Sequence, residues 1–536
     1  MTRKQGTCDV ILRGGSVIDG LGGPAVFASV ALSGDRITAV GDLDGWEAGR
    51  TIDVSGLAVA PGFIDMHSHS DLALLVNGRA ESKIRQGVTT EVIGQCGFSP
   101  APSPKEQWAH IRELSGWMGA YVDWRWETFG QYLDALADSG VSVNVVPLVG
   151  HSMVRTVVMG EENRAPTGAE LAAMADAVRA AMDEGAFGMS TGLVYAPGMW
   201  AETEELIALA RAMSAAGGIY FSHLRNEGPG LLDAIGEAVR IGREAGVGVQ
   251  IAHLKASGEA SWGRAGEALA AIEQARARGE AEVSYDAYPY TAWNTGLGQL
   301  LPAWAREGGS DAVMRRLRDP ETRARIRAAI EAEAAEEPCR WERRLLASVE
   351  TEANRGLQGL TLAEVARRRG KPVPDVVMDL LIEEDGQASM VGFAMSEEDV
   401  RRILAHPIGM IGSDSAASAP YGRLGESHPH PRTYGTFPRV LGHYARDEGI
   451  FSLEEAVAKM TSRPAAKLGL ADRGRIAPGV AADITVFDPA AIADQADYTR
   501  PHQYPVGIRY VIVNGVVELD GEAHQDRRPG RVIRRG

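Results

Sequence analysis

The sequence has few cysteines and no long hydrophobic run, and both shortages limit what the protein can be. Its only cysteines are Cys8, Cys96 and Cys339, which are odd in number and too widely spaced for a disulfide framework. No apolar stretch approaches the ~18 residues that suggest a membrane-spanning helix, and residues 1–6 lack the apolar centre of a signal peptide. We therefore expect a protein of the reducing cytoplasm without a membrane partner.

Positive charge is also scarce. The 55 lysines and arginines are outnumbered by 71 acidic residues, so the net charge is −16. A nucleic-acid-binding surface needs a basic patch, so we expect no nucleic-acid partner. The arginines near the C-terminus are interpreted as a solvated tail; they are Arg527, Arg528, Arg531, Arg534 and Arg535. The oligomeric state stays open.

The two ends of the chain have the pattern of short β-strands. A chain of 536 residues with 45% hydrophobic content can bury a large core in more than one domain. Short strands separated by Gly and Asp turns fill residues 8–60, and similar strands return at 484–487 and 507–514. We predict a small β-sandwich domain formed by both chain ends, residues 1–60 and 461–536.

Residues 61–460 alternate apolar strands with helical stretches, which is typical of a parallel α/β barrel. The predicted strands cover 59–67, 88–96, 143–149, 186–190, 219–223, 247–253, 282–288 and 408–414. This is the strand number of a (β/α)8 TIM-like barrel. A ninth run, 389–394, is a competing seventh strand. Residues from about 303 to 385 are too many for a βα loop, and we predict a largely helical insertion that could cover the barrel mouth.

Residues that can bind a metal stand at the ends of the predicted barrel strands. The set is His67, His69, Cys96, His223, His253 and Asp414. Catalytic groups of such barrels lie at the carboxyl ends of strands, and side chains two residues apart on a strand, such as His67 and His69, face the same side. Singly, each has an ordinary explanation: a structural histidine, a buried hydrophobic cysteine or a helix-capping aspartate. Together they predict a Zn²⁺ site, since zinc accepts imidazole, thiolate and carboxylate ligands.

The motifs around these residues resemble a known family. The stretch Gly62-Phe63-Ile64-Asp65-Met66-His67-Ser68-His69 is similar to the metal motif of the amidohydrolase superfamily. Residues 94–97, 221–225, 251–255 and 428–432 resemble the N-acyl-D-amino-acid deacylase (D-aminoacylase) branch, and the resemblance runs nearly end to end. It implies a metal-dependent amidohydrolase that cleaves the amide bond of N-acyl-D-amino acids and releases a carboxylate and a free D-amino acid.

The resemblance also implies roles for individual residues. In this branch a cysteine replaces the carboxylated lysine that bridges two metals in many relatives. A tight zinc site would contain Cys96, His223 and His253, and a second, often weakly filled site would contain His67, His69, Cys96 and Asp414. Asp414 would shuttle a proton from the attacking, metal-activated water to the leaving amine. The substrate's free carboxylate would be bound by Lys255, Arg432 and one of three neighbouring tyrosines, for which we choose Tyr288 over Tyr285 and Tyr290.

Two other functions stay open. A cyclic-amide hydrolase of the dihydroorotase or hydantoinase type usually needs a bridging lysine at the fourth strand, and residues 185–191 contain none. A non-catalytic barrel could hold zinc for structure, but structural sites are closed, whereas this set places a carboxylate beside an open position. The segment 414–432 is longer than in the best-known D-aminoacylases, so the acyl group and amino-acid side chain of the substrate are not predicted. The D preference rests on the resemblance alone.

Overall fold

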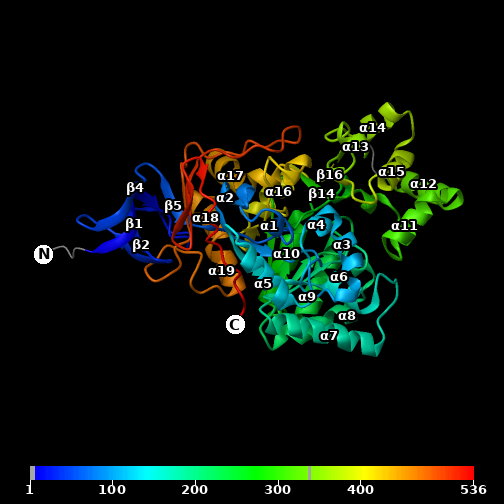
Figure 1. Cartoon of the computed structure of the whole chain (residues 1–536), viewed down its shortest axis with the longest axis horizontal. Coiled ribbons are helices and arrows are strands. Elements are labelled where there is room, and N and C mark those ends of the chain that lie inside the picture. The colour runs from blue at the N-terminus through cyan, green and yellow to red at the C-terminus, as the bar shows by residue number, and fades with distance from the viewer. Residues whose placement is uncertain (1–5, 336–339) are drawn as a thin grey trace.

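The computed structural model describes residues 6–335 and 340–536 (Figure 1). The first five residues and Cys339 lie outside the described residues. Across the described part of the chain, no helix has both the length and the apolar character needed to cross a membrane.

Strands from both chain ends form one sheet. It contains β1 (Thr7–Val17), β2 (Val26–Ser33), β3 (Arg36–Gly41), β4 (Glu47–Asp53), β5 (Ala58–Pro61), β18 (Ile484–Phe487), β19 (Ile508–Val513), β20 (Val516–Asp520) and β21 (Ala523–His524). β5 pairs in antiparallel fashion with β18, and this contact joins the two halves. Leu12 and Val30 from the first half share an apolar core with Ile484 and Ile512 from the second. The chain ends therefore form a common β domain.

The barrel is built from parallel strands. One sheet contains β6 (Phe63–Asp65), β7 (Val88–Ile93) and β8 (Asn144–Pro147), and the other contains β9 (Val149–Gly150), β10 (Gly188–Gly192), β11 (Ile219–His223), β12 (Gly248–Ile251), β13 (Val283–Ala287) and β17 (Gly409–Ile411). At one junction the Met66 amide donates to the Ile411 carbonyl at 3.2 Å; at the other, β8 continues into β9 through Leu148. The strands thus close into the predicted barrel.

Helices cover the outside of the barrel. They include α5 (Phe129–Ser139), α7 (Gly168–Asp183), α8 (Thr203–Ser214), α9 (Leu231–Ala245), α10 (Ala265–Ala277), α16 (Glu397–Ala405) and α18 (Leu453–Met460). In α9, Leu231, Ile235 and Val239 recur every four residues and are all buried, so they form the apolar stripe that packs on the strands. Gly246 ends this helix in the left-handed conformation.

The first predicted barrel strand, residues 59–67, is two strands. β5 belongs to the small domain and β6 to the barrel, and Gly62 lies between them. A Cβ at Gly62 would lie 2.2 Å from Thr89 Oγ1, so only glycine fits here. The Gly62 amide donates to the Asp483 carbonyl at 2.8 Å. The chain passes from one sheet to the other at this residue.

The insertion is a helical lobe with a sheet of its own. Its helices include α11 (Gly309–Arg318), α12 (Pro320–Ala334), α14 (Leu362–Arg369) and α15 (Val373–Glu383), which lie at the opposite end of the molecule from β1 and β2 (Figure 1). β16 (Ser389–Phe393) pairs in antiparallel fashion with β14 (Ala292–Gly296) and β15 (Arg344–Leu346). The run 389–394 is therefore not a barrel strand. The prediction of helices was correct, but it missed this sheet.

Most of the C-terminal arginines are exposed, as expected, but the segment that carries them is docked on the barrel and is not a free tail. The Val145 amide donates to the Arg531 carbonyl at 2.9 Å, and the Ile533 amide donates to the Val145 carbonyl at 2.8 Å. The side chain of Arg534 pairs with Asp134 at 2.5 Å. These partners lie hundreds of residues away in the sequence, so composition alone does not reveal them.

Candidate metal centre

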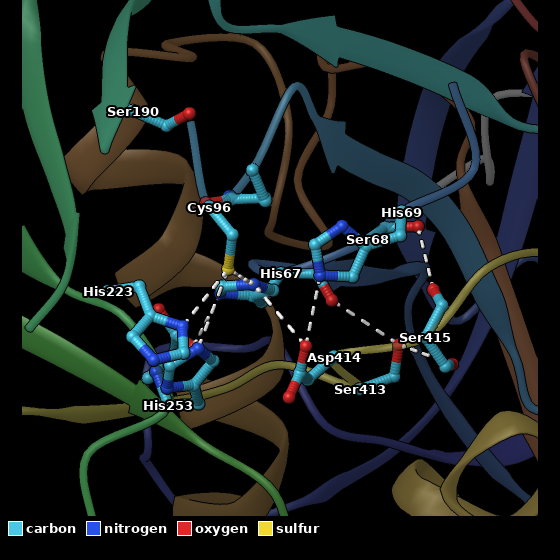
Figure 2. Close-up of polar contacts among 12 residues, drawn as sticks. His67, Ser68, His69, Cys96, Ser190, His223, His253, Ser413, Asp414 and Ser415 are labelled. Carbon is cyan, nitrogen blue, oxygen red and sulfur yellow. Dashed lines mark hydrogen bonds and ion pairs between the residues drawn. The ribbon is translucent and has the colours of Figure 1, made fainter. Parts of the chain in front are cut away.

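The six predicted ligands lie together at the carboxyl ends of the barrel strands (Figure 2). Their ligand atoms form two overlapping groups: His67, His69, Cys96 and Asp414, and Cys96, His223 and His253. Within each group all ligand atoms lie within 4.8 Å of one another. Cys96 belongs to both groups, so one thiol links the two halves of the centre.

The distances show how closely the side chains converge. Cys96 Sγ lies 3.3 Å from His67 Nε2, 3.5 Å from His223 Nδ1 and 3.6 Å from His253 Nε2. Asp414 Oδ1 lies 3.0 Å from His69 Nε2 and 3.6 Å from His67 Nε2. All these donor atoms therefore point into one small volume.

The electrostatics favour the ligating forms of Cys96 and Asp414. Burial alone would raise the pKa of Cys96, but the charge of His67 and hydrogen bonds from His223 and His253 outweigh it and lower that pKa well below its usual value. Burial would likewise raise the pKa of Asp414, but Arg432 and His253 hold it well below its usual value. Thiolate and carboxylate are the forms that bind metal. Together with the four histidines, these donors are the ligand types that zinc accepts, so the residues present fit zinc.

Three of these residues have an unusual backbone conformation. The φ angles of Cys96, His253 and Asp414 are 53°, 34° and 49°. Residues other than glycine rarely adopt positive φ, and each such residue costs roughly 1–3 kcal/mol. The chain accepts this cost at the points where strand ends turn their side chains towards the centre.

Two carboxylates that the sequence reasoning did not assign hold the histidines in place. Glu227 Oε1 lies 3.0 Å from His253 Nδ1 and 2.5 Å from Lys255 Nζ, and its Oε2 lies 3.7 Å from His223 Nε2. Asp286 Oδ1 lies 3.3 Å from His67 Nδ1 and accepts the His253 amide at 2.8 Å. Such partners fix the orientation of ligand rings. The sequence offered two signals for these roles. Glu227 lies four residues after His223, and Asp286 is a charged residue within an apolar strand.

A buried ion pair fixes the strand ends behind the centre. Lys83 Nζ lies 2.8 Å from Asp65 Oδ2, and both side chains are fully buried. Asp65 Oδ1 accepts the amides of His67 at 3.2 Å and Ser413 at 2.8 Å. Figure 2 shows Ser413 beside Asp414. The pair therefore ties the ends of β6 and β17 together and sets the separation of His67 and Asp414.

The three residues expected to bind a carboxylate lie beside the centre. Arg432 Nη1 is 2.9 Å from Asp414 Oδ2, and its guanidinium lies 4.8 Å from the centre of the Tyr288 ring. Lys255 Nζ lies 5.6 Å from the same ring. The Tyr288 hydroxyl is buried and has no hydrogen-bond partner among the described residues. The Tyr290 hydroxyl is likewise buried and without a partner among the described residues, whereas the Tyr285 hydroxyl donates to the Ile403 carbonyl at 2.7 Å. Of the three tyrosines, only Tyr288 lines a cavity that opens on the centre.

Two cavities open on the centre. The first, of about 590 Å³, lies on the side of His69 and Cys96. The second, of about 520 Å³, lies on the side of His223 and His253. Asp414 and Tyr195 border both. A ligand that spans the centre can therefore place one part in each cavity.

Comparisons with known proteins show the family to which the chain belongs. A family model described as "Amidohydrolase family" matches residues 50–517. The D-aminoacylase of Alcaligenes xylosoxydans xylosoxydans is 43% identical, with 98% of each chain covered. The crystal structure of N-acyl-D-glutamate deacylase from Bordetella bronchiseptica, complexed with zinc and a phosphonate mimic of the tetrahedral intermediate, is 35% identical with a TM-score of 0.83, and covers 98% of this chain and 100% of that chain. A D-hydantoinase structure, 16% identical with a TM-score of 0.55 and 98% of each chain covered, shares the fold alone.

Proposed function

The chain belongs to the amidohydrolase family, and from this premise we propose that it hydrolyses N-acyl-D-amino acids with zinc as its cofactor. The products are a carboxylate and a free D-amino acid. The observation that carries the proposal is the half-buried Cys96 thiol, which lies within 3.6 Å of ring nitrogens of His67, His223 and His253. Its place between the two ligand groups matches a centre bridged by thiolate rather than by lysine.

The proposed ligand sets follow the two groups. Cys96, His223 and His253 would hold one zinc ion tightly, and His67, His69, Cys96 and Asp414 would form a second site. Zinc bound there would supply Lewis-acid activation of water and of the amide carbonyl. Because Cys96 must stay reduced to bind metal, the reducing cytoplasm is the proposed compartment.

The chain's own residues would move the proton and orient the substrate. Asp414 is kept ionised by Arg432, so its carboxylate can take the proton of the attacking water and then give it to the leaving amine. Lys255, Tyr288 and Arg432 would bind the carboxylate of the amino acid. This anchor holds the scissile amide beside Asp414, and such positioning accelerates the reaction.

The cyclic-amide alternative is weaker. A D-hydantoinase shares only the fold with this chain, and β10, at the fourth barrel strand, reads Gly-Met-Ser-Thr-Gly without a lysine. A non-catalytic zinc barrel is also weaker, because two cavities meet at Asp414. Neither alternative explains an unpartnered buried tyrosine beside Lys255 and Arg432.

The test is a substrate panel with metal analysis on the same sample. N-acetyl-D- and N-acetyl-L-amino acids are compared with hydantoins and dihydroorotate. We expect hydrolysis of the D-amino-acid derivatives by protein that contains zinc. Hydrolysis of the cyclic amides alone, or of nothing in the panel by zinc-loaded protein, would overturn the proposal.

A further inference from the structure

The two cavities at the centre differ in how many charged side chains line them. The second cavity is lined by Lys255, Arg225, Arg340 and Arg344 and by several acidic residues. The first has Phe98, Trp117, Met118 and Leu424 among its walls, together with serine and threonine hydroxyls. Of its few charged residues, Glu350 pairs with Arg423, and Arg432 lies at the junction with the second cavity, where it contacts Asp414 and the Tyr288 ring. The first cavity is therefore suited to a neutral, partly apolar group.

The carboxylate-binding residues assign the two halves of the substrate to the two cavities. Lys255 and Tyr288 line the second cavity but are absent from the first, whereas Arg432 borders the first at its junction with Asp414. An amino-acid carboxylate held by Lys255 and Tyr288 directs that half of the substrate towards the second cavity. The acyl group, on the other side of the scissile amide, then points into the first, which we call the acyl-side cavity.

The acyl-side cavity is much larger than an acetyl group requires. Its volume of about 590 Å³ lies within the range of about 300–1,000 Å³ that holds whole small-molecule ligands. An acetyl group would fill only a small part of it.

Interlocking segments from distant parts of the sequence build this cavity. Its walls come from α4 (Gly116–Tyr121), from residues of the insertion that include Ser348 and Glu350, and from the loop after Asp414. The His428 amide donates to Ser348 Oγ at 3.3 Å, and Arg355 pairs with Glu426 at 2.7 Å. Arg423 of the loop pairs with Glu350 of the insertion and stacks 4.9 Å from the Trp117 ring. The long segment 414–432 is thus a cavity wall.

We propose that the substrate carries a neutral acyl group considerably larger than acetyl, of the size of hexanoyl or phenylacetyl, bound in the acyl-side cavity. The inference rests on the proposed deacylase function. The length of the acyl group is then selected on the His69 and Cys96 side of the centre. The residues that select it belong to α4, to the insertion and to the loop after Asp414.

The first experiment measures kcat/KM of the zinc-loaded enzyme for one D-amino acid carrying formyl, acetyl, butanoyl, hexanoyl, octanoyl or phenylacetyl groups. Burial of apolar surface predicts a rise of up to about fourfold per added methylene, so hexanoyl should exceed acetyl by at least tenfold. A series that is flat or falls beyond acetyl overturns the inference but leaves the deacylase function intact. No hydrolysis of any member overturns the proposed function itself.

The second experiment narrows the cavity. Met118→Trp should lower kcat/KM for the hexanoyl substrate at least tenfold more than for the acetyl substrate. Ala120→Trp is the matched control, because Ala120 lies on the same helix but is exposed and does not line the cavity; it should leave both values unchanged. Leu424→Trp narrows the same cavity from the loop after Asp414 and should have the same effect. It replaces Met118→Trp as the test if that variant does not fold. An equal loss on both substrates in both wall variants contradicts the inference.

Discussion

The two ends of the barrel are built in opposite ways. At the mouth, Cys96, His253 and Asp414 adopt positive φ and crowd titratable groups into one buried volume. At the base, the chain is closed by ordinary contacts: Ile533 of the tail packs with Ile64 and Phe187, and Lys459 donates to the backbone carbonyls of His406 and Gly409. The mouth therefore gives up stability to bring reactive groups together, whereas the base contributes stability and no chemistry. Changes at the mouth should therefore affect catalysis, and changes at the base should affect unfolding.

The largest effect is expected for Cys96→Ala at the mouth. Loss of the shared thiolate should remove tightly bound zinc and lower kcat/KM by at least about 10⁴-fold, since metal supplies several kcal/mol of charge stabilisation. The fold should persist, because the apolar core is untouched and alanine at this positive φ is no more strained than cysteine. Zinc content, circular dichroism and kcat/KM are measured together. A variant with normal zinc content and full activity would show that Cys96 is not a ligand.

Asp414→Asn separates proton transfer from metal binding at the same mouth. The amide keeps the shape but cannot act as a base, so kcat should fall about 10²–10⁴-fold. Zinc held by Cys96, His223 and His253 should remain, because Asp414 belongs only to the other ligand group. A fall in kcat of less than tenfold with zinc retained would assign the proton shuttle to another residue.

Arg432 variants test whether the mouth also recognises a carboxylate. Wild-type enzyme should strongly prefer an N-acyl-D-amino acid to its uncharged C-terminal amide. Arg432→Ala should reduce this preference by about 10–100-fold, the size of a hydrogen bond to a charged group. Arg432→Lys should recover only part of it, because lysine lacks the planar fork. The ratio of the two substrates is the readout, since loss of the contact with Asp414 affects both substrates alike. If the wild type hydrolysed the acid and the amide equally well, Arg432 would not bind the substrate carboxylate.

The mouth could be predicted from the sequence to a much greater extent than the base. His223 ends β11 as expected, and all six metal-binding candidates converge, because residue type and strand position carry that information. Glu227 and Asp286 were not assigned, since a carboxylate's role as a ring partner depends on spatial neighbours. The base was misjudged for the same reason: the contact between Arg531 and Val145 joins residues that only the closed barrel brings together.

Removal of residues 531–536 tests the base. The truncation deletes the backbone bonds to Val145, the packing of Ile533 and the pair between Arg534 and Asp134. We expect a loss of roughly 1–3 kcal/mol in the free energy of unfolding with kcat/KM unchanged at 25 °C. Arg527→Ala, at an exposed position just before the tail, is the control and should change neither. If the truncated protein lost activity while its unfolding was unaffected, the division between mouth and base would fail.

The effect expected from Lys459 at the base appears only as a dependence of stability on pH. Burial, reinforced by Arg463 and opposed by Glu455, lowers the pKa of Lys459 from 10.5 to about 7. Between these two values the unfolded chain holds one more proton than the folded chain, so the free energy of unfolding rises with pH, by at most about 1.4 kcal/mol per pH unit. Below about pH 7 both states are protonated, and the full cost of burying the charge remains.

Lys459→Met removes this titration. From pH 7 to 9, the free energy of urea unfolding of the wild type should therefore rise relative to that of the variant by about 1–3 kcal/mol. Contributions of zinc and of other titrating groups occur in both proteins and cancel in the difference. Lys105→Met, at an exposed position, is the matched control and should run parallel to the wild type. If Lys459→Met also ran parallel, the buried ammonium would stay charged throughout. The base would then contain a buried charge of the kind that otherwise distinguishes the mouth.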